Sequence, residues 1–192
     1  MQNGTYNLTY ANPITVASGS SGTLTIQNIS STVYAVYSGL ITLNNNLTLD
    51  GGVGSGPSLR LTGNITGTGN IIMNNPGGGH IELYGSSVNP IGSITHSGVG
   101  SSSTHISAVI GTNVTAITQN STTSALTLSG INTYAGPITN SAGKINLTQT
   151  TTYSTMTLAP DTTTKITAGK TITVSSLVWW TAKTEQVHKI EN

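Results

Sequence analysis

LTGNITGTGNIIMNNPGGGHIELYG, residues 61–85, alternates short segments that favour β-strands with turns rich in Gly, Asn and Pro. In strand-like segments such as NIIM and HIEL, apolar residues stand at alternate positions, so each strand would bury one side only. Similar segments recur every 6–12 residues, among them LITL at 40–43, INLT at 145–148 and TMTL at 155–158. Strands this short cover one narrow core, and the pattern predicts an all-β protein.

A longer repeat indicates how these strands are arranged. The strand ALTL in ALTLSGINTYAGPITNSAGKINLTQ (125–149) runs into Gly130, as the strand IELY runs into Gly85, and these glycines are 45 residues apart. Thr95 and Thr139, each in an Ile-Thr pair after a proline, are 44 apart, and YANPIT at 10–15 nearly copies YAGPIT. A period of this size is typical of stacked units. We predict a right-handed parallel β-helix of about nine coils, with roughly 22 residues per coil and two coils per repeat.

An antiparallel β-sandwich is the alternative fold, because it also contains short strands separated by turns. Asn-Gly and Asp-Gly, the pairs that favour tight hairpins, occur only at 3–4 and 50–51. Asn recurs instead within turns, where its amide can bond to the same position of the next coil. The turn residues therefore favour the β-helix.

The composition excludes several classes of function. Only 6% of the residues are charged, the formal net charge is +1, and the six Lys and Arg residues never form a run. A nucleic-acid partner needs a dense basic surface, which is missing. The absence of Cys excludes disulfides and thiolate metal sites. No apolar run is long enough to predict a membrane-spanning helix, and MQNGTYNLTY lacks the features of a signal peptide.

The C-terminal segment differs from the rest of the chain. Residues 177–192 carry both tryptophans together with Lys183, Glu185, Lys189 and Glu191. Adjacent residues of a strand point to opposite faces, so Trp179 and Trp180 cannot both fill one narrow core. We therefore predict a solenoid domain over residues 1–176 and a C-terminal cap or interface segment over 177–192, with Trp179 and Trp180 as interface candidates.

The ionisable side chains do not predict a catalytic or metal site. Glycosidases need two neighbouring carboxylates, and Asp50 and Glu82 are 32 residues apart, which fits neither one coil nor two. His96 and His105 flank a Ser/Gly loop, but Zn²⁺ usually takes three or four ligands. DGGVGSG at 50–56 places its Asp ahead of the glycines, unlike calcium-binding repeats. We expect no enzyme activity, metal or cofactor.

Asparagine and threonine supply two further kinds of candidate site. Threonine triplets at 23–25, 66–68, 155–157 and 171–173 are spaced by 43, 89 and 16 residues, too irregular for a stacked ice-binding grid. Eight Asn-x-Ser/Thr sequons are candidates for glycosylation: Asn3, Asn7, Asn28, Asn46, Asn64, Asn113, Asn120 and Asn146.

The repeats resemble a known family. GNITGTGN at 63–70, LTLSGINTYAGPIT at 126–139 and SAGKINL at 141–147 are similar to the autotransporter-associated β-strand repeat. This repeat occurs in the passenger domains of bacterial type V secreted proteins and related haemagglutinin-like adhesins. The resemblance implies a right-handed β-helix that is exposed at a cell surface.

Together these observations predict a non-enzymatic, extracellular or cell-surface β-solenoid that serves a structural or adhesive role in a fibre or adhesin. Its expected partners are other copies of itself, a flanking domain, or a glycan or protein of a host surface. A virion fibre or tail-spike-like module is the alternative function, and a polysaccharide-acting enzyme is the third.

Overall fold

The computed structural model describes residues 7–19, 21–30, 32–52, 59–179 and 189–191 of the 192-residue chain. These residues form twenty strands joined by turns and contain no helix, so the described part has no helix able to cross a membrane. Every strand pair between described residues is parallel. The predicted parallel β-solenoid is therefore confirmed, and the antiparallel sandwich is excluded.

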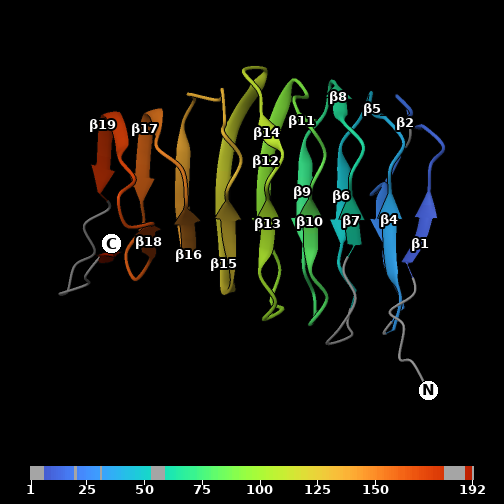
Figure 1. The fold of residues 1–192 in the computed structure, drawn as a ribbon, viewed down its shortest axis with the longest axis horizontal. Helices are drawn as coiled ribbons and strands as arrows, with labels where there is room; N and C mark the ends of the chain where they lie inside the picture. Colours follow the sequence, from blue (N-terminus) through green and yellow to red (C-terminus); the bar gives the residue numbers. More distant parts are fainter. Residues whose placement is uncertain (1–6, 20, 31, 53–58, 180–188, 192) are drawn as a thin grey trace.

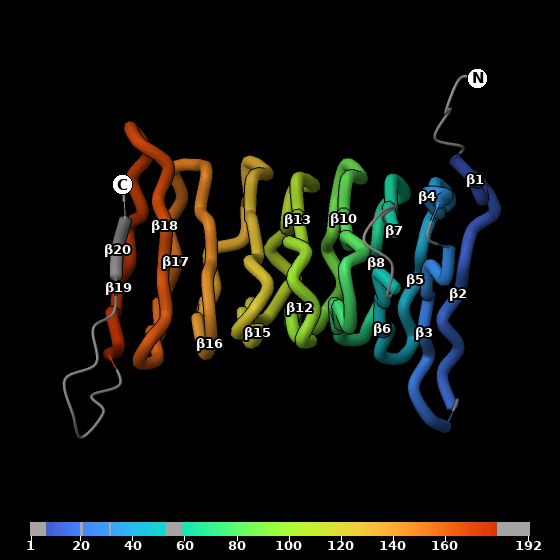
Figure 2. Tube along the Cα trace, turned by 90° about the horizontal axis from the view of Figure 1, so that it is seen from below, coloured from blue at the N-terminus to red at the C-terminus, as the bar shows by residue number. Residues whose placement is uncertain are grey.

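Successive strands wind around a common axis and build three faces (Figures 1 and 2). The first face contains β1 (Asn7–Tyr10), β4 (Tyr34–Tyr37), β7 (Leu59–Leu61), β10 (Ile81–Leu83), β13 (Thr104–Ile106), the second halves of β15 (Val114–Leu128) and β16 (Ile138–Leu147), β18 (Thr163–Ile166) and β20 (Lys189–Glu191).

The second face is shorter than the other two. It contains β2 (Ile14–Val16), β5 (Ile41–Leu43), β8 (Ile65–Gly67), β11 (Ser87–Val88) and β14 (Val109–Ile110). The third face contains β3 (Thr25–Gln27), β6 (Leu47–Asp50), β9 (Ile71–Asn74), β12 (Gly92–Ser97), the first halves of β15 and β16, β17 (Thr151–Leu158) and β19 (Ile172–Trp179).

The strand register explains the repeat of 44–45 residues. Thr95 pairs with Thr118, and Thr118 pairs with Thr139, so the two Ile-Thr pairs lie two turns apart. YANPIT at 10–15 is not equivalent to YAGPIT, because Ile14 begins β2 on the second face whereas Ile138 begins β16 on the third. The described residues form about seven turns rather than nine. Two facts account for the lower number of turns. The first turns are longer than 22 residues, as the pairing of Leu8 with Ala35 shows, and the chain termini lie outside the described residues.

Small residues recur where the first face bends into the second, namely Gly39, Gly63, Gly85, Ala108 and Gly130. Gly39, Gly63 and Gly85 stack here, and a Cβ on Gly63 would lie 1.8 Å from the carbonyl oxygen of Gly39. A Cβ on Gly130 would lie 2.2 Å from the carbonyl oxygen of Ala108, one turn earlier. Backbones of successive turns thus approach too closely at this corner for most side chains.

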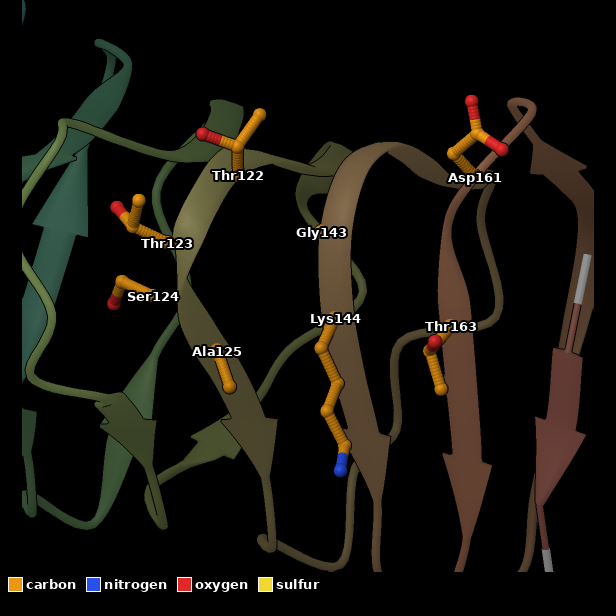
Figure 3. A pocket seen from close by; sticks show the side chains of 8 residues that line it. All are labelled: Thr122, Thr123, Ser124, Ala125, Gly143, Lys144, Asp161 and Thr163. Carbon is orange, nitrogen blue, oxygen red and sulfur yellow. The ribbon is translucent and has the colours of Figure 1, made fainter.

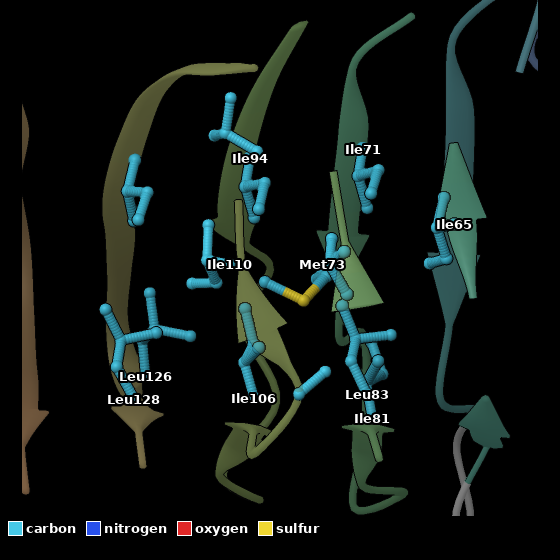
Figure 4. Close-up of a cluster of buried hydrophobic side chains, with 14 of the residues drawn as sticks. Ile65, Ile71, Met73, Ile81, Leu83, Ile94, Ile106, Ile110, Leu126 and Leu128 are labelled. Carbon is cyan, nitrogen blue, oxygen red and sulfur yellow. The ribbon is translucent and has the colours of Figure 1, made fainter. Parts of the chain in front are cut away.

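The core is a set of columns in which each side chain stacks on its counterpart in the next turn. Buried Ile and Leu residues from all three faces fill the middle turns (Figure 4). Leu59, Ile81, Leu126 and Ile145 belong to one such column, interrupted by Thr104. Among the described strands, none continues the second face after β14, and buried Tyr134 and Tyr153 lie in the following turns with ring centroids 6.1 Å apart.

Candidate functional site

A groove of about 310 Å³ lies where the third face bends into the first, across β15, β16 and the turn before β18 (Figure 3). The pairing of β15 with β16 shifts register between Ser121 and Ala125, and the intervening residues form one wall. Gly143 has a φ of 66° and Asp161 a φ of 58°, which places both in the left-handed region. The groove is lined by Thr122, Thr123, Ser124, Ala125, Gly143, Lys144, Asp161 and Thr163.

The groove combines hydroxyl groups with one cation and one anion. Lys144 and Asp161 form no ion pair with each other, and their charged groups point in different directions (Figure 3). Both are therefore available to a ligand together with the threonine hydroxyls, of which that of Thr123 already donates to the carbonyl oxygen of Gly100 at 2.8 Å. A polar, open groove of this size suits a small polyhydroxylated molecule better than an apolar one.

Three polar side chains form a buried hydrogen-bonded set behind the groove. His96 Nδ1 lies 2.6 Å from Gln119 Oε1, and His96 Nε2 lies 3.3 Å from Ser124 Oγ. Gln119 Nε2 donates to the carbonyl oxygens of Ser121 and Ser124, at 3.0 and 2.8 Å. Because the amide nitrogen faces these carbonyls, Oε1 faces the ring, and Nδ1 of His96 must carry a proton.

The serine and histidine of this set are arranged like a Ser-His nucleophile pair, but neither side chain is accessible to a substrate. His96 is 0% exposed and Ser124 only 2% exposed. Ser124 Oγ donates its one proton to the carbonyl oxygen of Ser102 at 2.5 Å, so it does not donate to His96. Burial lowers the pKa of His96, and its hydrogen bond to Gln119 opposes this shift only in part. A neutral, enclosed histidine beside an enclosed hydroxyl links neighbouring turns and presents no nucleophile to a substrate.

A second polar cluster lies on the outside of the first face. Arg60 and Glu82, which pair in adjacent turns, form an ion pair of 2.7 Å. The guanidinium of Arg60 lies 4.9 Å from the ring centroid of Tyr84 and 5.5 Å from that of Tyr34. His105 contacts the ring of Tyr84 edge-on, with the centroids 5.7 Å apart. This cluster, named here the Arg60 cluster, joins four successive turns, those of β4, β7, β10 and β13.

The acids and histidines that the sequence singled out lie apart. Asp50 ends β6 on the third face, Glu82 lies on the first face, and Asp161 lies in the groove. His96 is inside the solenoid, whereas His105 belongs to the Arg60 cluster. The described residues contain no group of three or more His, Cys, Asp or Glu side chains that suits a metal ion.

Trp179 lies at the last described position of β19, and Trp180 lies outside the described residues. Trp179 pairs with Leu158, a core residue, so it continues a core column, yet it is 47% exposed. Leu177 continues the neighbouring column above Met156 and is 41% exposed. β19 crosses the expected domain boundary at residues 176–177 without a break.

The sequon asparagines occupy different environments. Asn28 is buried, and its side chain bonds to Val33 and Ser30, so it is unsuited to carry a glycan. Asn146 is half-buried and donates to Thr127. Five others are exposed: Asn7, Asn46, Asn64, Asn113 and Asn120, while Asn3 lies outside the described residues.

Several turn asparagines bond to the next turn, as their recurrence suggested. The Oδ1 atoms of Asn46, Asn64 and Asn70 accept hydrogen bonds from the backbone N–H groups of Asn70, Ser87 and Ser93. Sequence reasoning missed the groove and the buried set. A signal for the latter existed, since His96, Gln119 and Asn140 each follow an Ile-Thr pair at matching positions of successive turns.

Comparison of the chain with protein-family models, with curated proteins and with solved structures finds no match. The resemblance to the autotransporter-associated repeat therefore stays a prediction.

Proposed function

We propose that this chain is a non-enzymatic, extracellular or cell-surface β-solenoid, a structural subunit of a fibre or adhesin that joins end to end with another copy or with a flanking domain. The observation that carries the proposal is the edge at each end of the ladders, where the outermost described strands have a described partner strand on one side only. Among the described strands, β1, β2 and β3 pair only with β4, β5 and β6, and β19 pairs only with β17.

The side chains at the two ends support this proposal. Leu8 and Tyr10 in β1 are 53% and 48% exposed, and Tyr10 stacks on Tyr37 with the ring centroids 5.0 Å apart. Leu177 and Trp179 end two core columns at the other end. An unpaired strand edge beside exposed apolar side chains favours addition of a further strand. Because the two ends differ, repeated addition gives an open filament rather than a closed dimer.

Substitutions at each end test the assembly. Tyr10→Glu and Trp179→Glu each place a charge on one end, so each variant alone should stay monomeric where the unchanged chain forms filaments. Mixing the two variants should give a 1:1 dimer, because each retains the end that the other has lost. Analytical ultracentrifugation and electron microscopy measure both outcomes.

A substitution on the side of the rod provides the control. Thr127 lies on the outside of the first face, away from both ends, so Thr127→Glu should leave assembly unchanged. An unchanged chain that stays monomeric at high concentration, or a mixture that fails to dimerise, would contradict end-to-end joining.

An adhesive role has its own support in the groove. Its threonine hydroxyls, the Lys144 ammonium and the Asp161 carboxylate match the donors and acceptors of a charged or neutral surface glycan. Lys144→Ala and Asp161→Ala should each abolish binding on a glycan array. Lys165→Ala, on the outside of the first face, is the matched control and should retain binding.

A further inference from the structure

The outside of the third face carries a column of residues that are mostly threonines. Each position pairs with the next in the strand register, and all alternate with buried core residues. From one turn to the next the column contains Thr48, Ile72, Thr95, Thr118, Thr139 and Thr157, and Thr25 and Val178 extend it at the two ends. The Thr-x-Thr triplets obscured this column in the sequence, because single threonines stack here and only two of the four triplets contribute a position, Thr25 and Thr157.

The column presents hydroxyl and methyl groups at regular spacing. Adjacent parallel strands are about 4.8 Å apart, which sets the distance between successive threonines. β-Branched side chains hold one χ1 rotamer more firmly than other residues do, so each hydroxyl and methyl keeps a defined direction. Thr95, Thr118 and Thr139 are partly exposed, and their hydroxyls form no hydrogen bond with the described residues.

The flanks of the column are narrow and nearly neutral. On one side Ser93 pairs with Ala116, and Thr155 pairs with Ser176. On the other side lie Asn74 and Ser97, with Asp50 as the one acid among the described positions. The strands of successive turns run almost parallel to one another along the rod (Figure 1).

The described part of this face carries one charged side chain, Asp50, and no outward aromatic ring, which limits the kind of partner it can bind. A polyanion requires a dense set of cations, which the described part of this face lacks, and sugar platforms usually present an aromatic ring, as Tyr84 does on the first face. A neutral surface of regularly spaced hydroxyls and methyls matches a neutral lattice of hydrogen-bonding molecules.

We infer that the third face binds the surface of ice. Each threonine hydroxyl holds a water molecule in the lattice, and each methyl group occupies a space between lattice waters. A single contact of this kind is weak, but the rigid column engages many at once, and their combined avidity retains the protein on the crystal. This inference is independent of end-to-end joining and of the groove.

Ice-growth measurements test this inference. The purified chain should lower the freezing point of water below its melting point, shape single ice crystals and suppress recrystallisation. Thr118→Lys, at the centre of the column, should abolish all three effects, because its long charged side chain holds the face away from the lattice. Fluorescently labelled chain should coat defined planes of a single crystal, and labelled Thr118→Lys should not.

The matched control is Thr127→Lys in the same strand, β15. Thr127 also points outward, but on the first face. This variant should retain the ice activity, and circular dichroism of both variants should match that of the unchanged chain. Absence of ice activity in the unchanged chain, or equal activity in a folded Thr118→Lys, would overturn the inference. Retention on insoluble cellulose or chitin without ice activity would also overturn it and would assign the face to a polysaccharide.

Discussion

One interior column of the third face passes through two chemically different regions. Its apolar region contains Leu49 and Met73, and its polar region contains His96, Gln119 and Asn140, before Leu158 restores an apolar side chain. All are buried, and the parallel backbone ladder runs through both regions. The backbone hydrogen bonds therefore determine the path of each turn. The side chains of the interior column can contact one another either through apolar packing or through hydrogen bonds between turns.

The two regions are stabilised by different terms. Apolar side chains gain free energy from leaving water, whatever the pH. Buried polar atoms must exchange water for protein partners, and each atom without a partner costs free energy. In the polar region this exchange is nearly complete at Gln119, whereas Asn140 Oδ1 has no partner among the described residues. Substitutions should therefore have different signatures in the two regions.

The largest effect should come from the apolar region. Met73→Ala removes a fully buried side chain and leaves a cavity, so we expect the free energy of unfolding to fall by about 2–5 kcal/mol. Denaturant unfolding at pH 5 and pH 8 should give the same loss. Met73→Leu, which nearly conserves volume, should cost less than about 1.5 kcal/mol. Equal losses for the two variants would show that this region is not tightly packed.

Gln119→Leu should have the next largest effect. It removes the acceptor of the His96 Nδ1–H group and the donors to the carbonyl oxygens of Ser121 and Ser124. We expect a loss of about 1–3 kcal/mol by denaturant unfolding, since buried groups lose their partners. Asn140→Leu is the comparison, and it should cost less because one of its two polar atoms is already unpaired. The reverse order would contradict the hydrogen-bond explanation.

The sequence predicted the features that depend on local pattern. Alternating segments such as HIEL and turns such as NNPGGG predicted short strands, and the distance between Gly85 and Gly130 predicted two turns per repeat, which the register confirms through Ala108. The near copy YANPIT suggested an equivalence with YAGPIT that the structure does not have. Tyr10 lies in β1 and Ile14 begins β2 on the second face, whereas Ile138, the counterpart of Ile14, begins β16 on the third face. Sequence similarity does not fix the face that a segment occupies.

The candidate sites depend on which residues stack on one another in successive turns. The number of residues between two stacked partners varies along the chain. Thr118 and Thr139 are 21 residues apart, but Thr48 and Ile72 are 24 apart. The threonine column and the contact between His96 and Ser124 therefore appear only once the register is known. The groove has the same origin, since it results from the shift in pairing between Ser121 and Ala125.

The pH dependence of stability should separate the two regions further. Burial lowers the pKa of His96, so the folded state binds its proton less readily than the unfolded state does. The contribution of neutral His96 is complete above about pH 6.5 and is lost as the pH falls below that value toward the lowered pKa. Each unit of lowering corresponds to about 1.4 kcal/mol.

Denaturant unfolding from pH 8 to pH 5 measures this loss. His96→Met extends the apolar region and should flatten the decline, while His80 and His105 remain in both proteins. An equal decline in both proteins would assign the effect to other groups.

The smallest effect should follow from Ser124→Ala. The serine has one proton, which it donates to Ser102 O, and this carbonyl also accepts from Asn75 Nδ2 at 2.8 Å. Ser102 O therefore keeps a partner in the variant, and we expect a loss of about 0.5–1.5 kcal/mol at pH 8.

At low pH a second role of Ser124 becomes measurable. With Nδ1–H directed to Gln119, protonation places the new proton on Nε2, facing Ser124 Oγ as an acceptor. Removing this oxygen should lower the pKa of His96 further and extend the decline in stability to lower pH. An NMR titration of the His96 ring measures the pKa directly, and an unchanged or raised value in Ser124→Ala would mean that the hydroxyl does not accept from the protonated ring.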